Sequence, residues 1–195
     1  MWGADEVRQR LAELGAADPE LRRFGAPSHR YQLKPPLTEE QVRAFEERHG
    51  IKLPEDYRDF LLQVANGGAG PCYGLFPLSD LLDPDGRDVE RVTPGEDFPH
   101  AEAWNCTFPP QAPDESDDDH RRRYEAHEER YFATAHVAGS IALCHYGCGD
   151  ILRLVVSGPQ YGTVWQDGRG GDYGIWPLHQ SFREWYDQWL RAETY

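Results

Sequence analysis

The chain has 195 residues, and its 34 acidic and 20 basic side chains give a net charge of −14. This balance argues against direct binding to nucleic acid or to an anionic membrane, because cationic contacts with phosphate dominate both kinds of affinity. The same charge favours fast, salt-sensitive association with a basic partner. A chain of this length can bury roughly 70% of its unfolded surface, so it needs no disulfide or metal to be stable.

The N-terminal stretch is charged and amphipathic, without the apolar segment of a secretion signal. No run approaches the roughly 18 consecutive apolar residues of a membrane-spanning helix. We therefore expect a cytoplasmic protein. Its four cysteines are expected to be reduced thiols, namely Cys72, Cys106, Cys144 and Cys148.

The first 36 residues are predicted to be an N-terminal helix followed by a linker. Val7, Leu11 and Leu14 are spaced four and three apart, which places them on one apolar stripe of a helix. Residues 25–36 are typical of a linker that ends on two prolines. We assign residues 37–195 to a single domain.

Two further helices are predicted over residues 38–50 and 54–66. Thr38 and Gln41 have the spacing of a capping box, and Gly50 is suited to a helix C-terminus. Pro54 stands at the first turn of the second helix, where its missing N–H costs nothing. One face of that helix carries the apolar residues Tyr57, Phe60, Leu61 and Val64.

A charged insertion is expected at about residues 83–130, where prolines and Asp/Gly pairs precede a block of acid beside a block of base. Like charges this close repel, so the acidic block should be a solvated loop or a helix N-terminus. A solvated loop with no partner is one interpretation. The other is a partner-binding site with the candidate contacts Asp114, Glu115, Asp117, Asp118 and Asp119.

The C-terminal part is predicted to form a mainly antiparallel sheet of about five to six strands. Short runs rich in β-branched and aromatic residues occupy residues 71–82, 131–139, 140–147, 149–158, 161–167 and 172–178. A final helix starts at a second capping box, Ser181 with Glu184, and carries an apolar face. Helices, then sheet, then helix indicate an α+β fold with helices flanking the sheet.

No catalytic constellation emerges from the spacing of reactive residues. Cys144, His145 and Cys148 offer metal ligands, but a structural zinc site needs four, and a strand places Cys144 and His145 on opposite faces. No motif for a nucleophile elbow, a catalytic cysteine or a phosphate loop occurs. We therefore expect no enzyme, metal or cofactor. A small metal-dependent enzyme using those three residues is the alternative.

Two separated segments resemble one known family. "LTEEQVRAFEERHGIKLPEDYRDFLLQVANGG", followed by "YGLFPL", is similar to the N-terminal signature of the SMI1/KNR4 family of the SUKH superfamily. "CHYGCGDILRLVVSGPQYGTVWQD" is similar to its second block, with a Gly-rich turn, a Leu-Val-Val strand and a Gly-x-Val-Trp strand. Gly147, Cys148 and Gly149 are then a tight turn between two core strands.

The resemblance implies a binding protein with no catalytic residues. Bacterial members of this family are commonly immunity proteins, which neutralise a cognate toxin domain that is often a nuclease or deaminase. The resemblance therefore implies a cytoplasmic immunity protein that occludes the active site of a basic toxin domain. The alternative is a regulatory scaffold, the role of fungal members, in which the acidic insertion mediates assembly.

Overall fold

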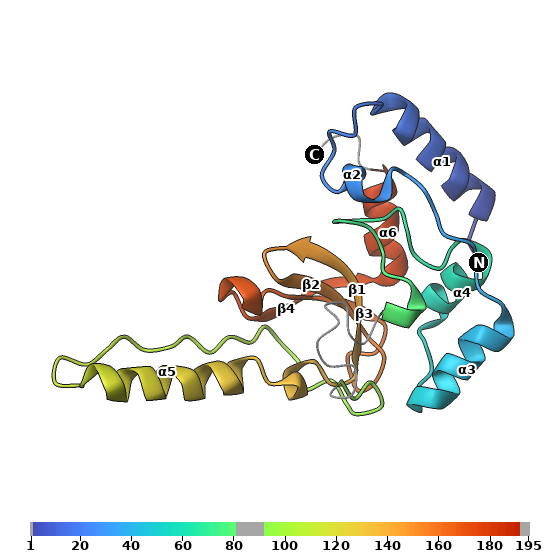
Figure 1. The fold of residues 1–195 in the computed structure, drawn as a ribbon. Coiled ribbons are helices and arrows are strands. Elements are labelled where there is room, and N and C mark those ends of the chain that lie inside the picture. Colours follow the sequence, from blue (N-terminus) through green and yellow to red (C-terminus); the bar gives the residue numbers. More distant parts are fainter. Residues whose placement is uncertain (1, 81–91, 192–195) are drawn as a thin grey trace.

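The computed structural model describes residues 2–80 and 92–191, so residues 83–91 of the expected insertion lie outside the described residues. Figure 1 shows a body of helices around a sheet, from which one long arm projects. The α-helices are α1 (Ala4–Ala17), α2 (Ala26–His29), α3 (Glu39–His49), α4 (Glu55–Gln63), α5 (Asp117–Tyr131) and α6 (Phe182–Arg191). Short 3-10 turns are η1 (Leu78–Asp80), η2 (Thr134–Val137) and η3 (Arg169–Gly171).

The described residues contain one antiparallel sheet of four strands, in the spatial order β1-β2-β3-β4. The strands are β1 (Ser140–Gly147), β2 (Asp150–Val155), β3 (Thr163–Asp167) and β4 (Ile175–Ser181). The α+β class and the antiparallel pairing agree with the expectation. The expected count of five to six strands is wrong, because two of the six predicted runs form no strand.

The backbone groups of these two runs have other partners. In residues 71–80, Leu75 forms only isolated bridges, to Gly68 and to Cys144. In residues 131–139, α5 continues to Tyr131, and the carbonyl oxygens of Tyr131 and Ala133 accept hydrogen bonds from Arg169 at 3.0 and 3.2 Å. Residues 134–137 of the same run form the 3-10 turn η2 and not an extended strand.

The β1–β2 turn has the predicted form. Gly147 pairs with Asp150, and Gly147, Cys148 and Gly149 all have positive φ, at 121°, 52° and 88°. Glycine adopts such angles without the Cβ penalty that other residues meet, so two glycines flank the one strained residue.

The main hydrophobic core lies between one face of the sheet and helices α1, α4 and α6. Each predicted apolar stripe faces it: Val7, Leu11 and Leu14 of α1; Tyr57, Phe60 and Leu61 of α4; and Phe182, Trp185, Tyr186, Trp189 and Leu190 of α6.

Both capping boxes are formed, at Thr38 with Gln41 and at Ser181 with Glu184. Residues 25–36, interpreted as a linker, contain α2 and a bridge from Leu33 to Gly68.

The opposite face of the sheet holds a smaller core and a buried ion group. Phe98, Val137, Val155, Trp165 and Ile175 form the apolar cluster. Beside it, Arg153 and Arg169 both bind Asp167, with Nε–Oδ distances of 3.2 and 2.7 Å.

Among residues 2–80 and 92–191, no helix is long and apolar enough to cross a membrane.

Candidate functional site

The arm comprises residues 105–131, an extended limb that runs back along helix α5 (Figure 1). Most of its residues are exposed, and Tyr131 is the only described residue of α5 that is buried. Little apolar surface is buried between its two limbs, which are held together by the Phe108 ring, 5.1 Å from the Tyr124 ring between centroids, and by polar contacts.

A clasp centred on Glu115 and Arg123 joins the two limbs. Arg123 Nη2 and Nε donate to the two carboxylate oxygens of Glu115 at 2.8 and 2.9 Å, and Arg123 also donates to the carbonyls of Pro109 and Pro110. The Arg123 guanidinium covers the ring of Phe108 at 4.6 Å. Its hydrogen bond lowers the pKa of Glu115 to about 2, so this clasp stays ionised across the physiological range.

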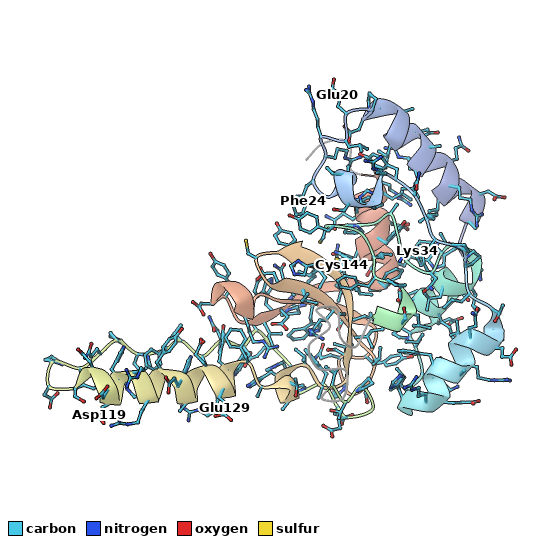
Figure 2. The ribbon with its side chains drawn as sticks, in the orientation of Figure 1. Glu20, Phe24, Lys34, Asp119, Glu129 and Cys144 are labelled. Atoms are coloured by element: carbon cyan, nitrogen blue, oxygen red, sulfur yellow. The ribbon has the colours of Figure 1, made fainter. Side chains whose placement is uncertain are left out.

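The five predicted acidic contacts do not form one uniform patch. Glu115 is largely covered and belongs to the clasp, whereas Asp114, Asp117, Asp118 and Asp119 are exposed at the tip of the arm, where Ser116 caps α5. Asp118 and Asp119 form ion pairs with Arg121 and Arg122 one turn away. Figure 2 shows Asp119 close to the free end of the arm. The acidic block is thus the N-terminal turn of a helix, one of the two forms expected.

The base of the arm is fixed to the body by stacked rings and backbone pairing. The Trp104 ring stacks on His136 at 4.0 Å and on Tyr131 at 5.5 Å between centroids. Trp104 and Ile175 exchange both backbone hydrogen bonds, at 2.8 and 2.7 Å. Gly174 permits this pairing, because an added Cβ would lie 2.1 Å from the Trp104 carbonyl oxygen. The arm therefore has a defined direction relative to the sheet.

A second surface, which we call the aromatic groove, was not anticipated from the sequence. Phe24, Tyr73 and Tyr146 are 46%, 44% and 49% exposed, and the Phe24 ring lies 5.1 and 5.5 Å from the other two. They adjoin a pocket of about 380 Å³. Its lining residues are Phe24, Pro71, Cys72, Tyr146, Leu152, Gln166, Leu178, Trp185 and Trp189.

The aromatic groove depends on one close backbone approach. Gly25 has a φ of 77°, and an added Cβ would lie 1.6 Å from the carbonyl oxygen of Cys72. Only glycine allows this contact, which brings Phe24 beside Tyr73. Because three distant segments supply the rings, no local pattern in the sequence marks the groove.

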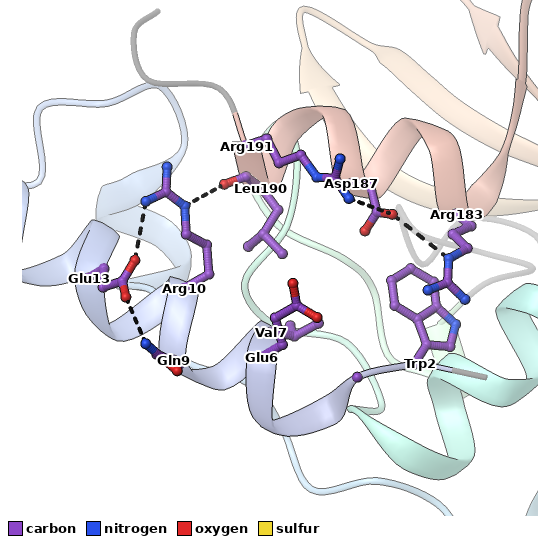
Figure 3. A pocket seen from close by; sticks show the side chains of 11 residues that line it. Trp2, Glu6, Val7, Gln9, Arg10, Glu13, Arg183, Asp187, Leu190 and Arg191 are labelled. Carbon is purple, nitrogen blue, oxygen red and sulfur yellow. Dashed lines mark hydrogen bonds and ion pairs between the residues drawn. The ribbon is translucent and has the colours of Figure 1, made fainter.

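A third hollow, of about 260 Å³, lies between α1 and α6 and is drawn in Figure 3. Most of its charged side chains are paired: Arg10 pairs with Glu13 and donates to the Leu190 carbonyl, and Asp187 forms ion pairs with Arg183 and Arg191. The hydrogen bond from Arg10 to Leu190 joins the two helices, and the ion pairs lie within each helix, so the hollow is a helix–helix seam.

The residues considered for metal chemistry do not converge. Cys144 is fully buried, where its thiol contacts Cys72 and burial raises its pKa, whereas Cys148 is exposed on the β1–β2 turn. In the described part of the chain, no group of three His, Cys, Asp or Glu residues is arranged to hold a metal ion.

Comparison with known proteins gives one match. The model of the SMI1 / KNR4 family (SUKH-1) matches residues 36–188, which include the sheet, the arm and helices α3 to α5. No curated protein and no solved structure matches the chain.

Proposed function

Since the chain belongs to the SMI1/KNR4 (SUKH-1) family, we propose that it is an immunity protein that binds a cognate toxin domain and covers the toxin's active site. The family match over residues 36–188 is the observation that carries this proposal, because bacterial members are expected to act in this way. Inhibition needs only binding, so the absence of a catalytic motif in the sequence is compatible with it.

The arm supplies the means of occlusion. The clasp of Glu115 and Arg123 orders the arm before any partner binds, which reduces the conformational entropy lost on association. A preordered projection can enter a cleft and exclude substrate.

The exposed carboxylates at the tip suit a basic cleft. Asp118 and Asp119 have side chains that are 68% and 60% exposed, and their arginine partners are equally exposed. Exposed ion pairs contribute only about 0–1 kcal/mol, so these carboxylates can exchange Arg121 and Arg122 for cations of a toxin at little cost. The net charge of −14 would accelerate the encounter with a basic domain.

The first test is growth of cells that express the C-terminal domain of the gene product encoded directly upstream of this gene, with and without this protein. We expect rescue of growth and a stoichiometric complex in size-exclusion chromatography. Toxicity that persists despite expression of this protein would contradict the proposal. If the protein instead forms a complex with a partner that has no toxin domain, the regulatory scaffold would be favoured.

The second test replaces the tip carboxylates of the arm, as the combined variant D114N/D117N/D118N/D119N. We expect association with the toxin to slow by about tenfold at low salt and to lose most of its salt dependence, because steering depends on these charges. The control D5N/E6Q/E40Q/E47Q removes four exposed charges outside the arm and changes the net charge equally. Equal rates for the two variants would show that the tip does not face the toxin.

A further inference from the structure

We propose that the aromatic groove binds an arginine side chain presented by the partner protein, a step that rests on the proposed function and names a second contact. The floor of the groove belongs to the main core, through Trp185, Trp189 and Leu152, but its three exposed rings lie outside that core. Phe24, Tyr73 and Tyr146 leave nearly half of their surface in water, although rings of this size usually gain much by burial. Clusters of exposed aromatic side chains beside a pocket are typical of binding hot spots.

The groove is rigid before it is occupied. The Tyr73 N–H donates to the His145 carbonyl at 3.2 Å, and the Tyr73 ring lies against Gly147. Gly25 fixes Phe24 from the other side, through its contact with Cys72. Rings that are already held in place lose little conformational entropy on binding, so more of the contact energy contributes to the affinity.

The net charge of the molecule, and not the lining of the groove, favours a cation over a neutral side chain. All nine lining residues are uncharged, on a molecule whose net charge is −14. The cations closest in sequence to Phe24 have acidic neighbours: Arg22 pairs with Glu20, and the charge of Arg23 acts on Asp18. A cation that enters therefore meets the negative faces of aromatic rings within a negative overall field.

Arginine fits this chemistry better than lysine. Its guanidinium is planar, weakly hydrated and able to stack on aromatic faces. The same geometry occurs inside this molecule, where Arg123 covers Phe108 and Arg183 covers Trp2 at 4.7 Å. A pocket of about 380 Å³ lies within the size range of small-ligand sites and accepts one such side chain.

The groove and the arm lie toward the same side of the body in one view. In Figure 2, Phe24 projects from the body toward the side to which the arm extends, and Asp119 marks the end of that arm. A basic partner surface that contacts the tip carboxylates could therefore also place an arginine in the aromatic groove. Two separated contacts bind more tightly than either does alone.

A probe titration tests the groove without any toxin. The protein, with ¹⁵N-labelled tryptophan, is titrated with N-acetyl-arginine amide, and with the citrulline and leucine amides as matched controls. We expect the indole signals of Trp185 and Trp189 to shift with the arginine amide at millimolar concentrations, and to shift at least fivefold less with either control. Equal shifts with citrulline, which has the same shape but no charge, would overturn the proposal.

Two exposed residues provide variants that should fold normally. We expect Y146A and F24A to weaken the arginine-induced shifts at least fivefold, while Y173A leaves them unchanged, since Tyr173 is 70% exposed and does not line the groove. Y146F, which keeps the ring, should retain most of the response. Shifts that survive Y146A and F24A would place the probe elsewhere.

The toxin complex then provides a separate readout. We expect Y146A to raise the dissociation rate of the complex by about tenfold to a hundredfold, as for a hot-spot aromatic residue, and Y173A to have no effect. If no toxin complex forms, the proposed function fails while the probe titration still decides the groove. If a complex forms and Y146A binds it normally, only the groove proposal fails.

Discussion

His29 is a buried histidine whose environment favours its neutral form. Its Nδ1 accepts the N–H of Tyr31 at 3.0 Å, and its ring lies edge-on to Trp189 at 5.8 Å. Its Nε2 has no hydrogen-bond partner among the described residues. Burial, assisted by the charge of Arg23, lowers the pKa of His29 to about 4. The imidazolium is therefore much less stable in the folded protein than in the unfolded chain.

This depressed pKa predicts acid destabilisation. Between pH 6.5 and pH 4, His29 is protonated in the unfolded chain but neutral in the folded protein. The free energy of unfolding therefore falls as the pH decreases from 6.5 toward 4. We expect His29 to account for about 1 kcal/mol of lost stability at pH 5, after allowance for solvent screening. Urea unfolding at pH 7.5 and pH 5 measures the loss.

The variant H29Q isolates this contribution. Burial also lowers the pKa values of His100 and His136, which act in the same direction, so H29Q should reduce the pH dependence without removing it. The substitution H179Q, at an exposed histidine, is the control. An unchanged pH dependence in H29Q would show that His29 is protonated in the folded protein.

A buried carboxylate, Asp167, adds a further link between the arm and the sheet. Burial opposes the ionisation of Asp167, but hydrogen bonds and charges from Arg169 and Arg153 outweigh it and lower its pKa. Arg169 extends from this group to the carbonyls of Tyr131 and Ala133, where α5 ends. The ion group thus connects β2 and β3 with the base of the arm.

Removing that carboxylate should be costly. The variant D167N removes the carboxylate that Arg153 and Arg169, both only 8% exposed, share, and we expect it to lower the free energy of unfolding by about 3–5 kcal/mol. Hydrogen exchange in α5 should accelerate as well. E39Q, which removes the carboxylate of the more exposed pair with Arg58, is the control and should change stability little. Equal stability losses in the two variants would contradict the role given to Asp167.

The hydrophobic core extends beyond the part of the chain that the family model matches. That match begins at residue 36, yet Trp2 contacts the rings of Phe60, Phe182 and Tyr186 at 5.2, 6.0 and 5.8 Å. Trp2 Nε1 also donates to the Asp56 carbonyl. Helix α1 therefore covers apolar surface that α4 and α6 would otherwise expose.

The variant W2A tests this dependence on the N-terminal segment. We expect a loss of about 3–5 kcal/mol in the free energy of unfolding, because the removed indole leaves a cavity among packed rings. E6A, at an exposed position of the same helix, should have little effect. Denaturant unfolding followed by circular dichroism measures both. A W2A protein as stable as the wild type would show that residues 1–17 are an appendage.

The sequence by itself determined the elements whose signals are local. The capping boxes at Thr38 and Ser181, the apolar faces of α4 and α6, and the glycine turn at 147–149 all depend on residues a few positions apart. Periodicity fixes which side chains share a face, whatever the rest of the chain does.

Only the tertiary structure decided what depends on contacts between distant segments. The run at 131–139 has strand-forming residues, but Arg169 binds its carbonyls and it forms no strand. In the sequence, Glu115 is one of five equivalent acidic residues. In the structure, its hydrogen bond with Arg123, eight residues away, sets it apart as part of the clasp. The aromatic groove joins Phe24, Tyr73 and Tyr146 through the glycine contact at residue 25. Such pairings are selected by the packing of the whole chain, and no spacing within a single segment encodes them.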